Sequence, residues 1–387
     1  MRRRFLTGLV AAGVLATQVV PGAASAEPAP DLTSAVVARL DGQRAAVKAV
    51  AATTPRVTIT KQADGWAFGT AVLATAPNSP AMPEGWLFVA REDGDRWRVA
   101  LEGEAAFGDL TAKAPVVSEV ERPLLTAQDG DQPHVRAAGG DYRTGMALPF
   151  LNGQSWGMHG GPHGWSGSAA PWSSIDLSGG DQVVRSVRRG TAYTMCTGWI
   201  RVIHDRGYST DYYHLWSSIN VNGAAVGFGT YLGTTGTDVT CGGAATGRHV
   251  HFGLRQNSAY IGIADHNLGK WVLQNGGSAY QGSALHGSTR VNVGGSLYNY
   301  GDLGLTQAVI DTNGGGPANK RTGPGSGYAL AGTVADGATV SVACSSNGTS
   351  HTGRWGTSSL WNKLTDGTWV SDAFTWTGVG GAVNGSC

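Results

Sequence analysis

The region between residues 141 and 304 constrains the fold most, because short apolar runs alternate there with clusters of Gly, Asn, Asp and Ser. Such clusters favour tight turns, and apolar runs as short as these fit strands better than helices. The whole chain contains 60 glycines and only 14% charged residues, a composition typical of β-rich proteins with many turns. We therefore expect a mainly β fold in which residues 141–304 form an antiparallel β domain.

The N-terminal part of the chain differs from this region in composition. Every glutamate lies at or before Glu121, and none occurs from Arg122 to Cys387. Before that break, residues 31–52 show helical periodicity and short strand-like runs follow them. A polar stretch with glycine and proline at 126–140 suits an exposed, protease-accessible linker. We expect residues 27–140 to form a small α+β pro-region and linker that cleavage removes.

The first residues have the pattern of an export signal. Three arginines precede an apolar run over residues 5–20, and the small residues Ala24, Ser25 and Ala26 follow. Polar and turn residues keep this run below the roughly 20 apolar residues that a membrane span needs. We expect residues 1–26 to be a signal peptide, the protein to be secreted and extracellular, and the mature form to have no membrane contact. The adjacent arginines suit both the general and the twin-arginine export route.

The C-terminal part is expected to form a separate unit. Residues 305–327, rich in Gly, Pro and Asn, predict a linker, and the short strands beyond it predict a small β-barrel over residues 328–387. In an oxidising compartment, four cysteines permit three disulfide pairings. We favour Cys196 with Cys241 and Cys344 with Cys387, because each pair lies within one expected domain. A cysteine-based zinc site is disfavoured, since the chain has no Cys-x-x-Cys spacing.

One segment of the β domain, residues 247–254, carries two histidines that alternate with apolar residues. On a strand, residues i and i+2 share a face, so His249 and His251 point one way. Val250, Phe252 and Leu254 then point the other way, into a core. Two imidazoles on one polar face can converge on a metal ion. The alternative is an exposed pair without a role, so further ligands are needed before the segment predicts a metal.

Upstream residues can complete a metal site. His163 follows a Gly-Gly-Pro turn, and Asp176 lies beside a second Gly-rich segment. Two neutral imidazoles and a carboxylate give three protein ligands and leave one tetrahedral position open, as in a catalytic zinc site. Taken alone, Asp176 fits a turn former and His163 fits a surface residue.

A general base in this domain must be a residue other than glutamate, because the domain contains none. Histidine exchanges a proton near neutral pH, since its ordinary pKa is about 6.5. The candidates are His214 and whichever of His249 and His251 is not a ligand. His214 lies on the second arm of an expected hairpin, on which Tyr212, His214 and Trp216 share one face. A purely structural His214 is the alternative.

Four segments, in this order, resemble the lysostaphin-type zinc metallopeptidases, and in particular their β-lytic and staphylolytic endopeptidase branch. They are Gly161-Pro162-His163 with residues 173–176, residues 207–215, residues 227–236 and residues 247–252. The resemblance covers about residues 141–302. It implies an antiparallel β-sheet groove with zinc on its floor, and it supports a disulfide between Cys196 and Cys241.

The resemblance also implies roles for the histidines. His163, Asp176 and His251 match the ligands of one zinc ion in the catalytic domain, while His214 and His249 match catalytic residues that do not bind the metal. Members of the family cut Gly-Gly or D-Ala-Gly type bonds in wall peptides. The function implied is that of a secreted zinc metalloendopeptidase that hydrolyses peptidoglycan.

The expected partners are bacterial peptidoglycan peptides. The terminal unit resembles bacterial Src-homology-type barrels that bind cell walls. In the alternative interpretation, its aromatic residues only form a small core. The formal net charge of +1 gives no general reason to bind nucleic acid or anionic lipid, and we expect a monomer. Two other functions stay open: a wall-binding protein with an inactive peptidase domain, and a zinc D-Ala-D-Ala carboxypeptidase.

Overall fold

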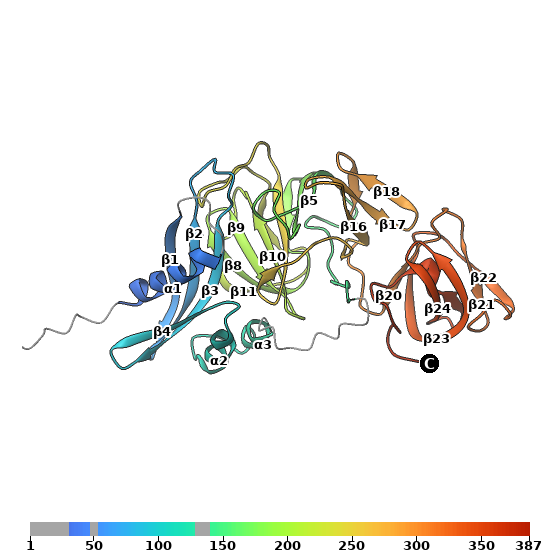
Figure 1. The fold of residues 1–387 in the computed structure, drawn as a ribbon, viewed down its shortest axis with the longest axis horizontal. Coiled ribbons are helices and arrows are strands. Elements are labelled where there is room, and N and C mark those ends of the chain that lie inside the picture. Colours follow the sequence, from blue (N-terminus) through green and yellow to red (C-terminus); the bar gives the residue numbers. More distant parts are fainter. Residues whose placement is uncertain (1–30, 47–52, 128–139) are drawn as a thin grey trace, which may run out of the picture.

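The computed structural model describes residues 31–46, 53–127 and 140–387. The expected signal peptide (1–26) and most of the first expected linker lie outside the described residues. Figure 1 shows the described parts as an N-terminal unit in blue to teal, a central β domain in green to orange, and a C-terminal unit in orange to red. None of the helices in these described parts combines the length and the apolar character needed to cross a bilayer.

The N-terminal unit is the small α+β structure that the sequence predicts. An antiparallel sheet in the order β1-β2-β3-β4 forms its centre. The helix α1 packs on one face of this sheet through Val36 and Leu40, both fully buried. The elements are α1 (Leu32–Ala46), β1 (Thr54–Ala63), β2 (Trp66–Ala74), β3 (Glu84–Asp93), β4 (Arg96–Leu101), α2 (Ala105–Lys113) and α3 (Arg122–Thr126).

The central domain is built on a nine-stranded sheet whose main path runs β11-β8-β9-β10-β13-β6-β5-β19, with β14 paired to β13. Its strands are β5 (Ser155–His163), β6 (Ser174–Gly179), β8 (Gly190–Cys196), β9 (Trp199–Ile203), β10 (Tyr208–Tyr213), β11 (Asn222–Val226), β13 (Val250–Gln256), β14 (Ala259–Tyr260) and β19 (Ser296–Tyr298). Two smaller sheets complete the domain: β7 (Val183–Arg185) with β12 (Tyr231–Thr234), and β15 (Asn267–Leu268), β16 (Trp271–Asn275), β17 (Gly282–His286) and β18 (Thr289–Asn292). The mainly β fold class is confirmed.

The two faces of the nine-stranded sheet have different surroundings. Val250, Phe252 and Leu254 of β13 are fully buried in the main core of the domain, as the alternation predicts. The opposite face meets the N-terminal unit, and the two share a second apolar core. Its members include Phe68, Leu87, Val89 and Phe107 from the N-terminal unit, with Tyr193, Trp199 and Tyr213 from the sheet. The N-terminal unit therefore covers one face of the central sheet.

The C-terminal unit is a seven-stranded antiparallel sheet in the order β22-β21-β25-β24-β23-β20-β26. Its elements are β20 (Gln307–Ile310), β21 (Ala318–Arg321), β22 (Leu330–Val334), β23 (Thr339–Gly353), β24 (Gly356–Leu364), β25 (Trp369–Ser371), η1 (Asp372–Phe374) and β26 (Thr375–Trp376). The expectation that residues 305–327 form a plain linker is wrong, because β20 and β21 lie within that range and pair into the sheet. Ala308 and Ile310 of β20 are fully buried, so a very short apolar run is enough to make a strand here.

Both favoured disulfides are present. Cys196 pairs with Cys241 in the central domain, and Cys344 pairs with Cys387 in the C-terminal unit. Each bond therefore closes a loop within one unit, as expected from the spacing.

Candidate metal centre

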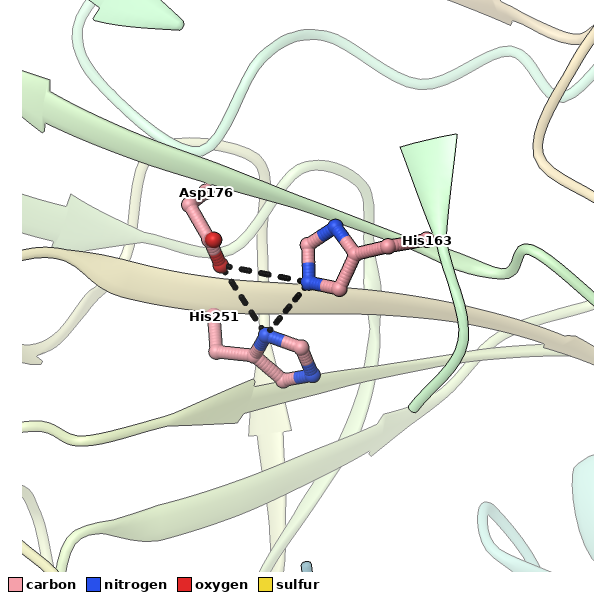
Figure 2. Close-up of side chains that lie close together, drawn as sticks. All are labelled: His163, Asp176 and His251. Atoms are coloured by element: carbon pink, nitrogen blue, oxygen red, sulfur yellow. Dashed lines mark hydrogen bonds and ion pairs between the residues drawn. The ribbon is translucent and has the colours of Figure 1, made fainter. Parts of the chain in front are cut away.

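Three neighbouring strands bring His163, Asp176 and His251 together (Figure 2). His163 ends β5, Asp176 lies in β6, and His251 in β13 sits directly opposite Asp176 in the antiparallel register. The Nε2 atom of His163 is 3.2 Å from Nδ1 of His251 and 3.6 Å from Oδ1 of Asp176. The Nδ1 atom of His251 is 3.0 Å from the same carboxylate oxygen. Sheet register thus converts three distant sequence positions into one cluster.

Backbone and aromatic contacts fix the ring of His163. Its Nδ1 atom lies 2.7 Å from the carbonyl oxygen of Gly161. A carbonyl can only accept, so Nδ1 carries the proton and the Nε2 lone pair points into the cluster. The ring stacks on Tyr280 with centroids 4.0 Å apart, and the ring of His251 lies 4.8 Å from Trp165. Tyr280 and Trp165 were not among the predicted site residues, because they come from loops with no recognisable motif.

The electrostatics of the cluster favour a neutral His163 beside an ionised Asp176. Burial lowers the pKa of His163 to about 4, although the Asp176 charge acts in the opposite direction. For Asp176, burial opposes ionisation, but the hydrogen bond with His251 and the nearby histidines outweigh it and hold the pKa of the carboxyl well below its usual range. A neutral imidazole and a carboxylate are the protonation states that metal ligands require.

The geometry of these three residues fits a zinc ion. With metal–ligand bonds of about 2.0–2.1 Å in a tetrahedron, two ligand atoms lie about 3.3–3.4 Å apart. The three separations in the cluster, 3.0, 3.2 and 3.6 Å, bracket that value. Within the described parts of the chain, this is the only group of three or more His, Cys, Asp or Glu side chains close enough to hold a metal.

His214 and His249 lie beside the cluster. Their ring centroids are 5.0 Å apart, and that of His214 is 6.0 Å from His251. The Nδ1 atom of His214 is 2.8 Å from the carbonyl oxygen of Asp238, and Nδ1 of His249 is 2.7 Å from that of Gly247. Each Nδ1 therefore donates to backbone, and each Nε2 is left as the acceptor. The Nε2 atom of His249 is 3.6 Å from Oδ1 of Asp176.

The expected common face of Tyr212, His214 and Trp216 is not formed. The strand β10 ends at Tyr213, and His214 has a positive φ of 67°. Tyr212 packs in the main core against Phe252, whereas His214 stacks on Tyr213 with centroids 4.4 Å apart. The left-handed backbone breaks the strand alternation, and it directs His214 towards His249 and His251.

The His, Asp, His cluster offers three ligands and so matches the ligand number of catalytic zinc sites, and two further histidines lie beside it. The protease LasA of Pseudomonas aeruginosa is 32% identical over 146 residues, which is 35% of this chain and 35% of LasA. The chain thus spans about a third of the length of that relative. The β-lytic metalloendopeptidase of Lysobacter enzymogenes is 31% identical over 147 residues, 35% of this chain and 82% of that protein. The chain belongs to the lysostaphin-type zinc metallopeptidase family, in its β-lytic branch.

Several solved structures are also similar to the chain. Pseudoalterin, a metalloprotease from the deep sea, is 30% identical and covers 40% of this chain and 97% of its own, with a TM-score of 0.38. No model of a protein family matches the chain.

Proposed function

We propose that the chain is a secreted zinc metalloendopeptidase that hydrolyses peptide bonds of the Gly-Gly or D-Ala-Gly type in bacterial peptidoglycan. The observation that carries this proposal is the convergence of His163, Asp176 and His251 with two other histidines beside them. The relatives named as a protease and a β-lytic metalloendopeptidase support it.

In this proposal, Nε2 of His163, Oδ1 of Asp176 and Nδ1 of His251 hold one zinc ion. When bound, zinc polarises a substrate carbonyl and lowers the pKa of water to about 7. The carbonyl of Gly161 keeps His163 in the tautomer that presents Nε2. The register between β6 and β13 places the carboxylate and the imidazole of His251 on the same side of the sheet.

His214 and His249 act on protons and charge beside this centre. Both donate Nδ1–H to a backbone carbonyl, so Nε2 of each can accept a proton or, once protonated, donate one. One of the two takes a proton from the attacking water, and the other stabilises the oxyanion and returns a proton to the leaving amine. Neither role needs a glutamate, which agrees with the composition of the domain.

The N-terminal unit acts as a pro-region that closes the groove. Its residues 75–83 contact two loops of the central domain. The backbone N–H of Thr75 donates to the carbonyl of Cys241 at 3.0 Å. At the other end, Trp165 donates its indole N–H to the carbonyl of Pro83 at 2.8 Å, and the N–H of Met82 donates to the hydroxyl of Ser166 at 2.9 Å. Removal of residues 27–140 then opens the groove to a peptide.

The C-terminal unit is proposed to bind the cell wall, with the protein acting as a monomer. It has a surface cavity of about 250 Å³ lined by aromatic and polar side chains, among them Arg321, His351, Trp361 and Phe374. Aromatic faces beside polar groups suit a peptide or sugar ligand.

Digestion of purified peptidoglycan, with the products read by mass spectrometry, tests the proposal. New glycine amino termini in cross-linked peptides are the expected result. Release of only a terminal D-Ala from free stem peptides would instead support a carboxypeptidase. Binding to walls without any cleavage would support the inactive wall-binding protein.

A further inference from the structure

A buried cluster of charges lies on the same sheet face as the metal centre. Asp211 of β10 receives two hydrogen bonds from the guanidinium of Arg201, at 2.9 and 3.0 Å. Trp199 and Tyr260 donate to the same carboxylate, at 2.8 and 2.9 Å. Arg255 of β13 stands 3.8 Å from Asp211, with its guanidinium 4.9 Å from the Tyr260 ring centroid. These residues all belong to the central domain.

The N-terminal unit supplies the remaining charge of this cluster. The Oε2 atom of Glu102 accepts a hydrogen bond from Nη1 of Arg201 at 2.7 Å, and its Oε1 lies 3.6 Å from Nη2 of Arg255. The side chains of Glu102 and Arg201 have no exposed surface. Nη1 of Arg201 also donates to the carbonyl of Gly85 at 3.0 Å, so both acceptors of that nitrogen come from the N-terminal unit.

The charge balance changes when the N-terminal unit leaves. With the N-terminal unit in place, Arg201 and Arg255 face Asp211, Glu102 and Glu84. Burial raises the pKa of Glu84 to about 7, and the formal charge of the cluster is zero when this carboxyl is protonated. Without the N-terminal unit, Arg201 and Arg255 face only Asp211, which leaves one positive charge and an unpaired Nη1. A buried or half-buried cation without a partner is costly, so this position favours a new anion. A guanidinium fork suits a carboxylate in particular.

The cluster is in reach of a peptide bound at the metal centre. His251, Gly253 and Arg255 alternate along β13 and share one face, and four steps of about 3.3 Å place Arg255 about 13 Å along the strand from His251. Trp165 covers Gly253 between them, because a Cβ at that glycine would lie 3.0 Å from the indole. Trp165 also stacks on Tyr260 with centroids 5.0 Å apart. The aromatic rings of Trp165 and Tyr260 therefore lie between the metal centre and Arg255.

We propose that Arg201 and Arg255 form a subsite for the carboxylate of an acidic residue in the peptide substrate, and that Glu102 of the pro-region occupies this subsite in the precursor. This inference rests on the proposed peptidase function and on removal of the N-terminal unit. The acidic residue lies about four residues from the scissile bond, because an extended peptide spans about 13 Å in four steps.

The test uses the processed chain, secreted from its full-length precursor, and a series of peptides with one Gly-Gly bond. Each peptide carries one Glu at a position two to five residues from that bond, on either side, and has a matched peptide with Gln at the same position. In the wild type, we expect kcat/KM at one position to be about tenfold higher for the Glu peptide than for its Gln counterpart. Arg255→Gln should bring this ratio close to one. Arg189→Gln, a change of a largely exposed arginine outside the cluster, should keep it.

A binding measurement separates failure of this inference from failure of the proposed function. In calorimetric titrations, the Glu peptide should bind about tenfold more tightly than its matched Gln peptide. This result is expected even if the chain cleaves none of the peptides. Equal values for Glu and Gln at every position in the wild type, or a preference that survives in Arg255→Gln, would overturn the subsite. Should Arg255→Gln not fold, Arg255→Lys keeps the charge but loses the planar fork, and its preference should fall several-fold.

Discussion

Replacing Gly160 by alanine is expected to weaken metal binding without unfolding the chain. Gly160 of β5 lies opposite Asp176 of β6. A methyl group at this position would overlap with Oδ2 of Asp176 and lie 3.0 Å from its Cγ. Carbon atoms pack favourably at about 3.5–4.0 Å, so the carboxyl group has to move by about 0.5 Å. Metal sites tolerate deviations of about 0.2 Å in ligand distance, so this shift is too large.

We expect the affinity of Gly160→Ala for zinc to fall by about 100-fold, the upper end of the range for residues that orient metal ligands. This corresponds to about 2.8 kcal/mol. Competition with a chromogenic chelator measures the affinity, and urea unfolding of the metal-free chain measures the stability. The backbone of Gly160 does not have a positive φ, so alanine adds no backbone strain there.

The matched control is Gly262→Ala, because a Cβ at Gly262 would meet no atom within 4 Å. This variant should bind zinc with the wild-type affinity. If Gly160→Ala also kept that affinity while remaining folded, Asp176 could not be a ligand in the position described above.

Two further predictions concern catalysis and the precursor. His214→Ala and His249→Ala should each retain zinc but lose about 100-fold or more in turnover, measured on a Gly-Gly peptide, because proton transfer and charge stabilisation are removed; wild-type turnover in either variant would make that histidine structural. For Glu84, burial raises the pKa to about 7, and the charged groups facing it are Arg255, Arg201 and Asp211. When the N-terminal unit packs on the central sheet, the pKa of Glu84 is higher than its free value of about 4.5. Protonated Glu84 therefore stabilises this packing fully below pH 4.5, and the stabilisation is lost as the pH rises through about 7. Contact between the N-terminal unit and the sheet should therefore weaken from pH 5 to pH 8, as followed by hydrogen exchange in β1–β4. The change should be smaller in Glu84→Gln, and an identical pH dependence in that variant would contradict the assignment.

Local patterns in the sequence predicted the parts of the site that depend on one strand. The alternation around His249 and His251 predicted which side chains enter the core, and Val250 and Phe252 are buried in it. The pairing of Cys344 with Cys387 followed from their position within one unit and is confirmed. These features depend on short-range geometry, with a period of two along a strand.

Other features depend on contacts between distant segments, and the sequence could not predict them. The glycine at position 160 is needed because Asp176 approaches it from another strand. The ion pair between Glu102 and Arg201 joins residues from two units. His214 points towards His249 and His251 because its own φ is positive, which the period of two along a strand does not predict. The strand β20 was missed because its apolar run is only a few residues long and lies in a Gly-rich stretch.

Metal analysis of the purified chain and its histidine variants tests the central claim most directly. We expect one zinc per chain in the wild type and in His249→Ala. We expect less than about a tenth of an equivalent in His251→Ala, because only His251 presents Nδ1 to His163 and Asp176. Zinc retained in His251→Ala but lost in His249→Ala would contradict the assignment of ligands and require the two histidines to exchange roles.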